Sequence, residues 1–155
     1  MLTLDIRGAD IDGDQVTCTG MQVASILDFI ATLPELGIGT WYAGAVEGLG
    51  KRLEDYEEPA PRLVPALSDL LQRIRGIPQL LDGVFAWVPG QETPRVEAKN
   101  FTADGPMAPL VLNALVEIWA FDTSYIEVYT ERTSIIAAIQ DRFMGNARAD
   151  ECSEN

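Results

Sequence analysis

The chain has 155 residues, 47% of them hydrophobic, which indicates a single globular domain that can bury its own core. Its 24 acidic and 11 basic residues give a formal net charge of −13 and a pI of about 4.2, which argues against direct binding to nucleic acid or to an anionic membrane. There is neither a basic leader followed by an apolar run nor an apolar segment of about 18 residues, so we expect a cytoplasmic protein.

The chain begins with a predicted strand and a polar turn. Apolar and polar residues alternate over residues 2–7, which predicts a strand. Its inward-facing side chains would be Leu2, Leu4 and Ile6. The following Asp10-x-Asp12-x-Asp14 has the spacing that begins a calcium loop, but Gln15 and Met21 stand where that loop needs Gly and Glu. We therefore expect a solvated turn without a metal ion.

A helix is predicted next. Thr19 and Gln22 have the spacing of a capping box, in which each side chain bonds the backbone N–H of the other. Pro34 and Gly37 are typical of a helix end. The apolar residues between these signals follow helical spacing, and they are Val23, Ile26, Leu27, Ile30 and Leu33.

Residues 39–46 then predict a strand whose glycines favour a β-bulge or a close approach of another backbone. Strict alternation places the side chains on two faces. Trp41, Ala43 and Ala45 would lie on one face, with Tyr42 and Val46 on the other.

A polar linker over residues 51–61 precedes a second predicted helix over 63–75, with Pro65 in its first turn and Gly76 and Pro78 after its end. The centre of the linker gathers four carboxylates around one tyrosine. These residues are Glu54, Asp55, Tyr56, Glu57 and Glu58. Such a cluster is typical of a solvated loop, and it can also attract Arg or Lys of a partner.

Two further strands and a hairpin follow. Residues 83–88 predict an apolar strand, and residues 95–99 predict an edge strand paired with it. Gly and Pro punctuate residues 105–109, with a short helical turn expected before Ala114. Residues 115–130 carry the longest β-favouring run, interrupted at Asp122-Thr123-Ser124, which predicts a hairpin.

The length of the hairpin loop decides which side chains share a face. A three-residue loop, which we favour, places the aliphatic side chains on the core face. It pairs Phe121 with Tyr125, Trp119 with Glu127 and Glu117 with Tyr129 on the opposite face. A two-residue loop would shift the pairing by one residue and move Trp119 and Phe121 toward Ile126 and Val128.

A last helix is expected from an N-cap at Thr130 to Gly145, and residues 146–155 are expected to form a disordered acidic tail. The order β-α-β-α-β-β-β-β-α predicts one α+β domain over residues 1–145. We expect a two-layer sandwich, in which about three helices pack on one face of a mixed, mostly antiparallel sheet.

The residue types present limit the chemistry. The chain has no histidine and neither GxGxxG nor GxxxxGK[ST], so it offers no His-based triad, no His metal ligand and no phosphate loop. Cys18 and Cys152 are too few and too far apart for a disulfide framework or a thiolate metal site. We expect no cofactor, no metal and no catalytic residue. The strongest carboxylate pair is Glu117 and Glu127, on adjacent strands.

Charge and aromatic content together favour a protein-binding module that occludes a basic partner, such as an immunity protein or another inhibitor acting on a toxin or a nucleic-acid-binding protein. Its predicted partner-binding residues are Glu54, Asp55, Tyr56, Glu57, Glu58, Glu117, Trp119, Phe121, Tyr125, Glu127 and Tyr129. One alternative is a small-ligand or carbohydrate-acting protein that uses Glu117 and Glu127. In the other, the aromatic face fills a second core layer or a homodimer interface.

Overall fold

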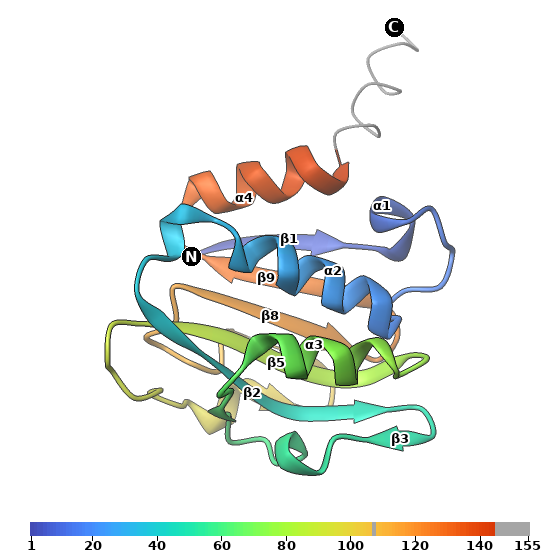
Figure 1. The fold of residues 1–155 in the computed structure, drawn as a ribbon, viewed down its shortest axis with the longest axis horizontal. Helices are drawn as coiled ribbons and strands as arrows, with labels where there is room; N and C mark the ends of the chain where they lie inside the picture. Colours follow the sequence, from blue (N-terminus) through green and yellow to red (C-terminus); the bar gives the residue numbers. More distant parts are fainter. Residues whose placement is uncertain (107, 145–155) are drawn as a thin grey trace, which may run out of the picture.

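A computed structural model gives the fold and describes residues 1–106 and 108–144. Seven strands form one antiparallel sheet in the order β1-β9-β8-β5-β2-β3, with β4 paired to β2 (Figure 1). The strands of this sheet are β1 (Leu2–Ile6), β2 (Gly39–Gly48), β3 (Lys51–Arg52), β4 (Arg62–Leu63), β5 (Leu80–Pro89), β8 (Val116–Phe121) and β9 (Tyr125–Thr130). The helices are α1 (Gly8–Ile11), α2 (Gly20–Ala31), α3 (Leu67–Arg75) and α4 (Thr133–Ile139).

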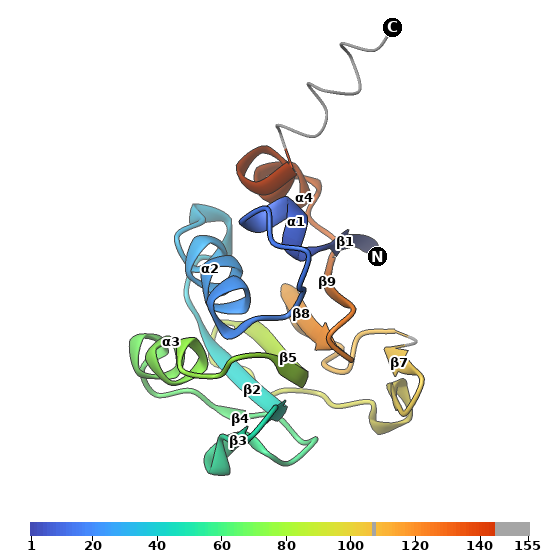
Figure 2. The ribbon, with the colours of Figure 1, turned by 90° about the vertical axis from the view of Figure 1, so that its right-hand side faces the viewer.

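The helices α2, α3 and α4 cover one face of the sheet, and the main core lies between these two layers (Figures 1 and 2). The aliphatic hairpin face supplies its sheet side, namely Val116, Ile118, Ala120, Ile126 and Val128. The predicted α+β two-layer fold is confirmed, and every pairing between the described strands is antiparallel. None of the helices in the described ranges is long and apolar enough to cross a membrane.

The helix α2 forms as its sequence predicts. Thr19 Oγ1 accepts a hydrogen bond from the Gln22 N–H at 3.1 Å, and Gln22 Oε1 accepts one from the Thr19 N–H at 3.2 Å. The capping box therefore satisfies two N–H groups at the helix start. Val23, Ile26 and Ile30 are buried in the core, as expected from their spacing.

The hairpin between β8 and β9 has the three-residue loop. Phe121 pairs with Tyr125, Trp119 with Glu127 and Glu117 with Tyr129. Asp122 and Thr123 both have positive φ, at 47° and 57°, and they make the tight turn that glycine usually makes. The predicted register is confirmed.

A β-bulge in β2 exchanges two predicted side-chain positions. The pairing of β2 with β5 shifts between Gly44 and Glu47, and Ala45 has a φ of 51°. Val46 therefore enters the main core, whereas Ala45 faces the opposite side of the sheet. The expected bulge is present, but the assignment of these two residues by strict alternation was wrong.

Three predicted elements differ in the structure. Residues 95–99 do not pair with β5, because β2 and β8 already occupy both of its edges. The helix α3 begins at Leu67 rather than near residue 63, since β4 joins the sheet beside β2. The segment before Ala114 is a single turn rather than a helix, and the Ala114 N–H closes this turn by donating a hydrogen bond to the Val111 carbonyl.

The last helix also begins later than predicted. Thr130 remains in β9, where its hydroxyl donates to the Leu115 carbonyl at 2.7 Å, and Arg132 takes the N-cap position of α4. A π-helical turn over Gln140–Met144 follows and buries Phe143. The predicted end at Gly145 and the tail over 146–155 lie outside the described residues.

The face of the sheet opposite the helices carries a second, smaller core. We call residues 95–106 and 108–111 the strap, because these residues cross that face and include the short strands β6 (Phe101–Thr102) and β7 (Gly105–Pro106) (Figure 2). Leu110 and Phe101 of the strap pack with Ala45, Val84, Trp119 and Tyr129 of the sheet. The aromatic hairpin face is therefore partly a second core layer.

Candidate protein-binding surface

Glu117 is buried at the centre of the second core. Its carboxylate accepts hydrogen bonds from the Leu110 and Val111 N–H groups at 2.8 and 2.7 Å, and from Trp119 Nε1. Burial raises the pKa of Glu117, and these three hydrogen bonds oppose that rise. Glu117 therefore fastens the strap to β8.

This burial corrects part of the predicted partner-binding face. Glu117 and Trp119 are each 1% exposed, and Tyr129 is 6% exposed, so a partner cannot reach them. The strap covers them because Leu110 and Phe101 provide the apolar surface that this side of the sheet needs. Glu117 is also inaccessible to a substrate, so Glu117 and Glu127 cannot act together on a substrate as a carboxylate pair.

Phe121 and Tyr125 remain half-exposed at the hairpin end of the same face. The strand pairing places two acidic residues beside them. Phe121 pairs with Asp82 of β5, and Asp82 pairs with Glu47 of β2. Partners in antiparallel strands point to the same side of a sheet, so these four side chains form one row about 14 Å long. We call Glu47, Asp82, Phe121 and Tyr125 the acidic row.

The carboxylates of the acidic row repel one another. Burial, followed by the charges of Glu47 and Asp122, raises the pKa of Asp82 from 3.8 to about 6. Next to the row, Asp5 of β1 pairs with Glu127 of β9, and burial followed by the charge of Asp5 raises the pKa of Glu127. Arg7 beside Asp5 and Arg52 opposite Glu47 compensate only part of the negative charge at this end of the sheet.

Strained backbone positions gather at the same end. Asp122 and Thr123 form the hairpin tip, and Ala45 forms the bulge two residues before Glu47. Cys18, with a φ of 66°, donates from Sγ to the Tyr125 carbonyl at 3.1 Å. Non-glycine residues persist in this conformation only where surrounding contacts hold them, and such positions are frequent at functional sites.

The predicted 54–58 cluster divides between two places. Tyr56 is buried beneath Arg73, whose guanidinium carbon lies 5.8 Å from the ring centroid, so its assignment as a partner contact was wrong. Asp55 pairs with the same arginine at 3.0 Å, and Glu54 is exposed. Burial of the aromatic ring of Tyr56 is favourable, and the guanidinium of Arg73 over the ring adds a cation–π contact.

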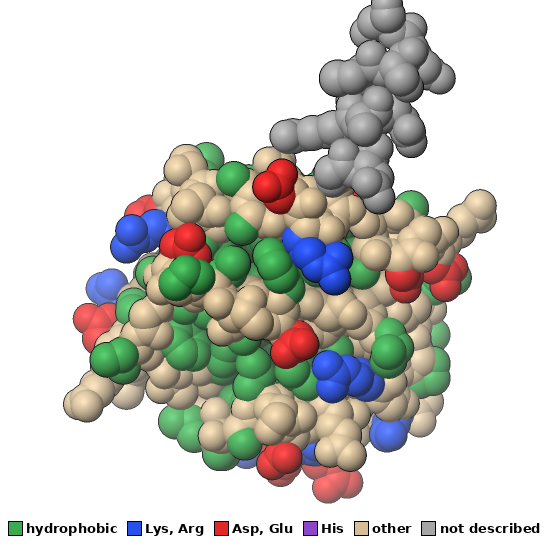
Figure 3. Space-filling view, turned by 45° about the horizontal axis from the view of Figure 1, so that its top comes forward, with side chains coloured by type: hydrophobic (Ala, Val, Ile, Leu, Met, Phe, Trp, Pro, Cys, Tyr) green, Lys and Arg blue, Asp and Glu red, His purple; other side chains and the backbone are tan. Residues whose placement is uncertain are grey.

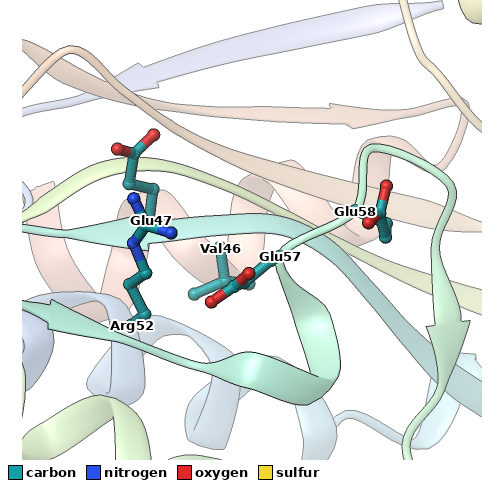
Figure 4. A pocket seen from close by; sticks show the side chains of 5 residues that line it. All are labelled: Val46, Glu47, Arg52, Glu57 and Glu58. Atoms are coloured by element: carbon teal, nitrogen blue, oxygen red, sulfur yellow. The ribbon is translucent and has the colours of Figure 1, made fainter.

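Glu57 and Glu58 extend the acidic surface. With Glu47, Val46 and Arg52 they line a hollow of about 230 Å³ beside the bulge (Figure 4). The Glu58 carbonyl accepts a hydrogen bond from the Ala45 N–H at 2.7 Å, which fixes this loop to β2. The hollow adjoins the acidic row through Glu47, which belongs to both.

Sequence reasoning missed Glu47, Asp82 and Asp5 as members of this surface. One predicted strand ended at residue 46, one position before Glu47. The other began at residue 83, one position after Asp82. Extending both strands would have placed an acid at each end, but only the bulge brings Glu47 to the face that carries Asp82.

The described ranges contain no group of three or more Asp, Glu or Cys residues placed to hold a metal ion. Comparison of the chain with protein-family models, curated proteins and solved structures found no match.

Proposed function

We propose that this protein binds a basic partner protein through the acidic row and the adjoining hollow, and that it occludes the partner's functional surface. It would act by binding rather than by catalysis, as an immunity protein or similar inhibitor of a toxin or a nucleic-acid-binding protein. A cytoplasmic location is part of the proposal, because Cys18 is a buried free thiol, which is typical of reducing compartments.

The observation that carries the proposal is the row of crowded carboxylates beside half-buried aromatic rings. Burial of Asp82, and then the charges of Glu47 and Asp122 near it, disfavour the ionised Asp82 carboxylate in the free protein. An arginine or lysine of a partner would remove this repulsion, so part of its binding energy comes from relief of the free state. Phe121 and Tyr125 add the half-exposed aromatic area that is frequent at interface hot spots.

Arg7 illustrates how this surface receives a guanidinium. Its guanidinium carbon lies 5.5 Å from the centroid of the Tyr125 ring, and Nη2 lies 3.7 Å from the Asp5 carboxylate. Its Nη1 also donates to the Ser124 carbonyl at 2.7 Å. An aromatic face with a carboxylate and a carbonyl at its edge is a suitable site for arginine. At the other end of the acidic row Arg52 of β3 lies opposite Glu47, whereas Asp82 forms no ion pair among the described residues.

The test is affinity capture with the full chain at low salt, followed by binding measurements on each captured basic protein. The double variant Glu47→Gln/Asp82→Asn should weaken binding roughly 10- to 100-fold, since it removes two interfacial charges. The matched control Asp28→Asn/Glu35→Gln removes two exposed charges from the helical side and should change binding less than about threefold.

Two further results are expected. Binding should weaken as the salt concentration rises, and the captured protein's own activity should fall as the complex forms. The proposal fails if both double variants weaken binding equally, or if the partner is captured equally well at high salt.

A further inference from the structure

The end of the sheet opposite the hairpin loop carries exposed apolar side chains. Ile38, Met1 and Leu112 are 86%, 60% and 54% exposed. Beside them is a hollow of about 260 Å³, whose apolar lining includes Pro89, Leu112 and Leu115. We call this surface the apolar end.

The backbone joins these side chains into one surface. Gly39 pairs with Pro89, and the Gly90 N–H donates to the Ile38 carbonyl at 2.8 Å, so the backbone of Ile38 lies beside Pro89, one of the residues that line the hollow. The Leu115 N–H donates to the Trp87 carbonyl at 2.8 Å and fixes the opposite wall. The exposed Ile38 and a hollow with both apolar and polar lining therefore lie at the same end of the sheet.

The charges at this end are balanced, unlike those of the acidic row. Glu131 and Arg132 line the hollow, and Glu92 and Arg95 line a neighbouring depression that shares Asn113 with it. In Figure 3, acidic and basic side chains stand next to each other along the left-hand rim, beside clustered hydrophobic side chains. Two copies of a protein with a net charge of −13 repel each other over most approaches, and this balance makes the repulsion weaker at this end than at the acidic row.

We propose that the apolar end is a homodimer interface, in which a two-fold axis places Ile38 of each copy in the hollow of the other. Two-fold contact requires a self-complementary surface, and the adjacent projection and hollow meet that condition. Glu131 and Arg132 carry opposite charges, so Glu131 of each copy can face Arg132 of the other copy. A stable interface needs about 800 Å² from each copy, roughly a tenth of the 8204 Å² accessible surface.

The test is the mass of the purified chain by sedimentation over concentrations from about 1 to 500 μM. A dimer should form in this range and become tighter with added salt, because salt screens the repulsion between the two acidic chains. Ile38→Glu and Leu112→Glu should each shift the midpoint at least about tenfold toward monomer, since each places a charge in the apolar contact.

Met21→Glu is the matched control. Met21 is exposed on α2, away from the apolar end, so this variant should dimerise as the parent protein does. The proposal is overturned if the parent chain stays monomeric throughout the range, or if Met21→Glu weakens the dimer as much as Leu112→Glu. Circular dichroism of each variant excludes loss of folding as the cause. Binding of a basic partner by Leu112→Glu is measured separately, so failure here leaves the acidic-row proposal open to its own test.

Discussion

At the scale of single residues, Asp82 connects the candidate surface to stability. A carboxyl whose pKa is raised on folding binds more protons in the folded than in the unfolded state, so the free energy of unfolding falls as the pH rises through this interval. For Asp82 the interval runs from 3.8 to about 6. The penalty is therefore fully present at pH 7.

Asp82→Asn should stabilise the protein at pH 7 by about 1 kcal/mol, a value reduced because water screens the half-exposed side chain. At pH 3.5 the gain should largely disappear, since the parent carboxyl is then mostly protonated. Urea denaturation at both pH values measures the difference, with the exposed Asp28→Asn as control. Equal effects of Asp82→Asn at both pH values would contradict the assigned charge crowding.

Glu117 has a different role at the same scale. Glu117→Gln replaces one acceptor oxygen with an NH2 group that faces N–H donors of the strap or of Trp119. The variant should lose about 2–4 kcal/mol of stability, because a buried donor is left without a partner. Thermal denaturation measures this loss, and Glu97→Gln on the strap is the matched control, expected within about 0.5 kcal/mol of the parent.

At the scale of elements, the hairpin loop stores backbone strain. Thr123 is β-branched and has a φ of 57°, a conformation that glycine adopts without steric cost. Thr123→Gly should therefore stabilise the protein by roughly 0.5–1 kcal/mol. Ser124→Gly, in the same loop but without positive φ, should be neutral or destabilising. Chemical denaturation distinguishes the two outcomes, and a gain from Ser124→Gly alone would contradict the observed turn.

Local patterns predicted those elements whose determinants lie close together in the sequence. The capping box set the start of α2, and alternation within residues 115–130 set the hairpin register. The bulge at Ala45 was harder to place, because one extra residue reverses every later side chain without changing composition. The edge assignment of residues 95–99 failed since only the assembled sheet shows that β5 has no free edge.

The candidate surface was predictable only in part for a similar reason. Phe121, Tyr125 and Glu127 lie on the expected face and are only partly buried. Glu117 and Trp119 share that face by alternation, but the strap covers them through contacts of Leu110 and Phe101 that follow no period in the sequence. Alternation predicts which side chains share a face of the sheet. Whether that face is buried depends on the segment that covers it, which alternation does not predict.

At the scale of the whole molecule, the net charge of −13 opposes compaction. Raising the salt concentration from about 10 to 150 mM should stabilise the fold by roughly 1 kcal/mol, equivalent to about 2–4 °C in Tm. Scanning calorimetry at low protein concentration measures this response. Glu47→Gln/Asp82→Asn should respond less to salt than the parent, and an equal response would mean that the acidic row contributes little to the repulsion.

The pairing of β1 with β9 bears on the order in which the molecule forms. Leu2 lies opposite Thr130, so β1 finds its partner only after the other strands of the sheet have been synthesised. Closing so long a loop is entropically costly and slow, and until then β1 remains unpaired while the growing sheet keeps an open edge. Nascent chains arrested before β9 should therefore hold residues 2–6 accessible to protease, and chaperones have their clearest opportunity to act during this interval.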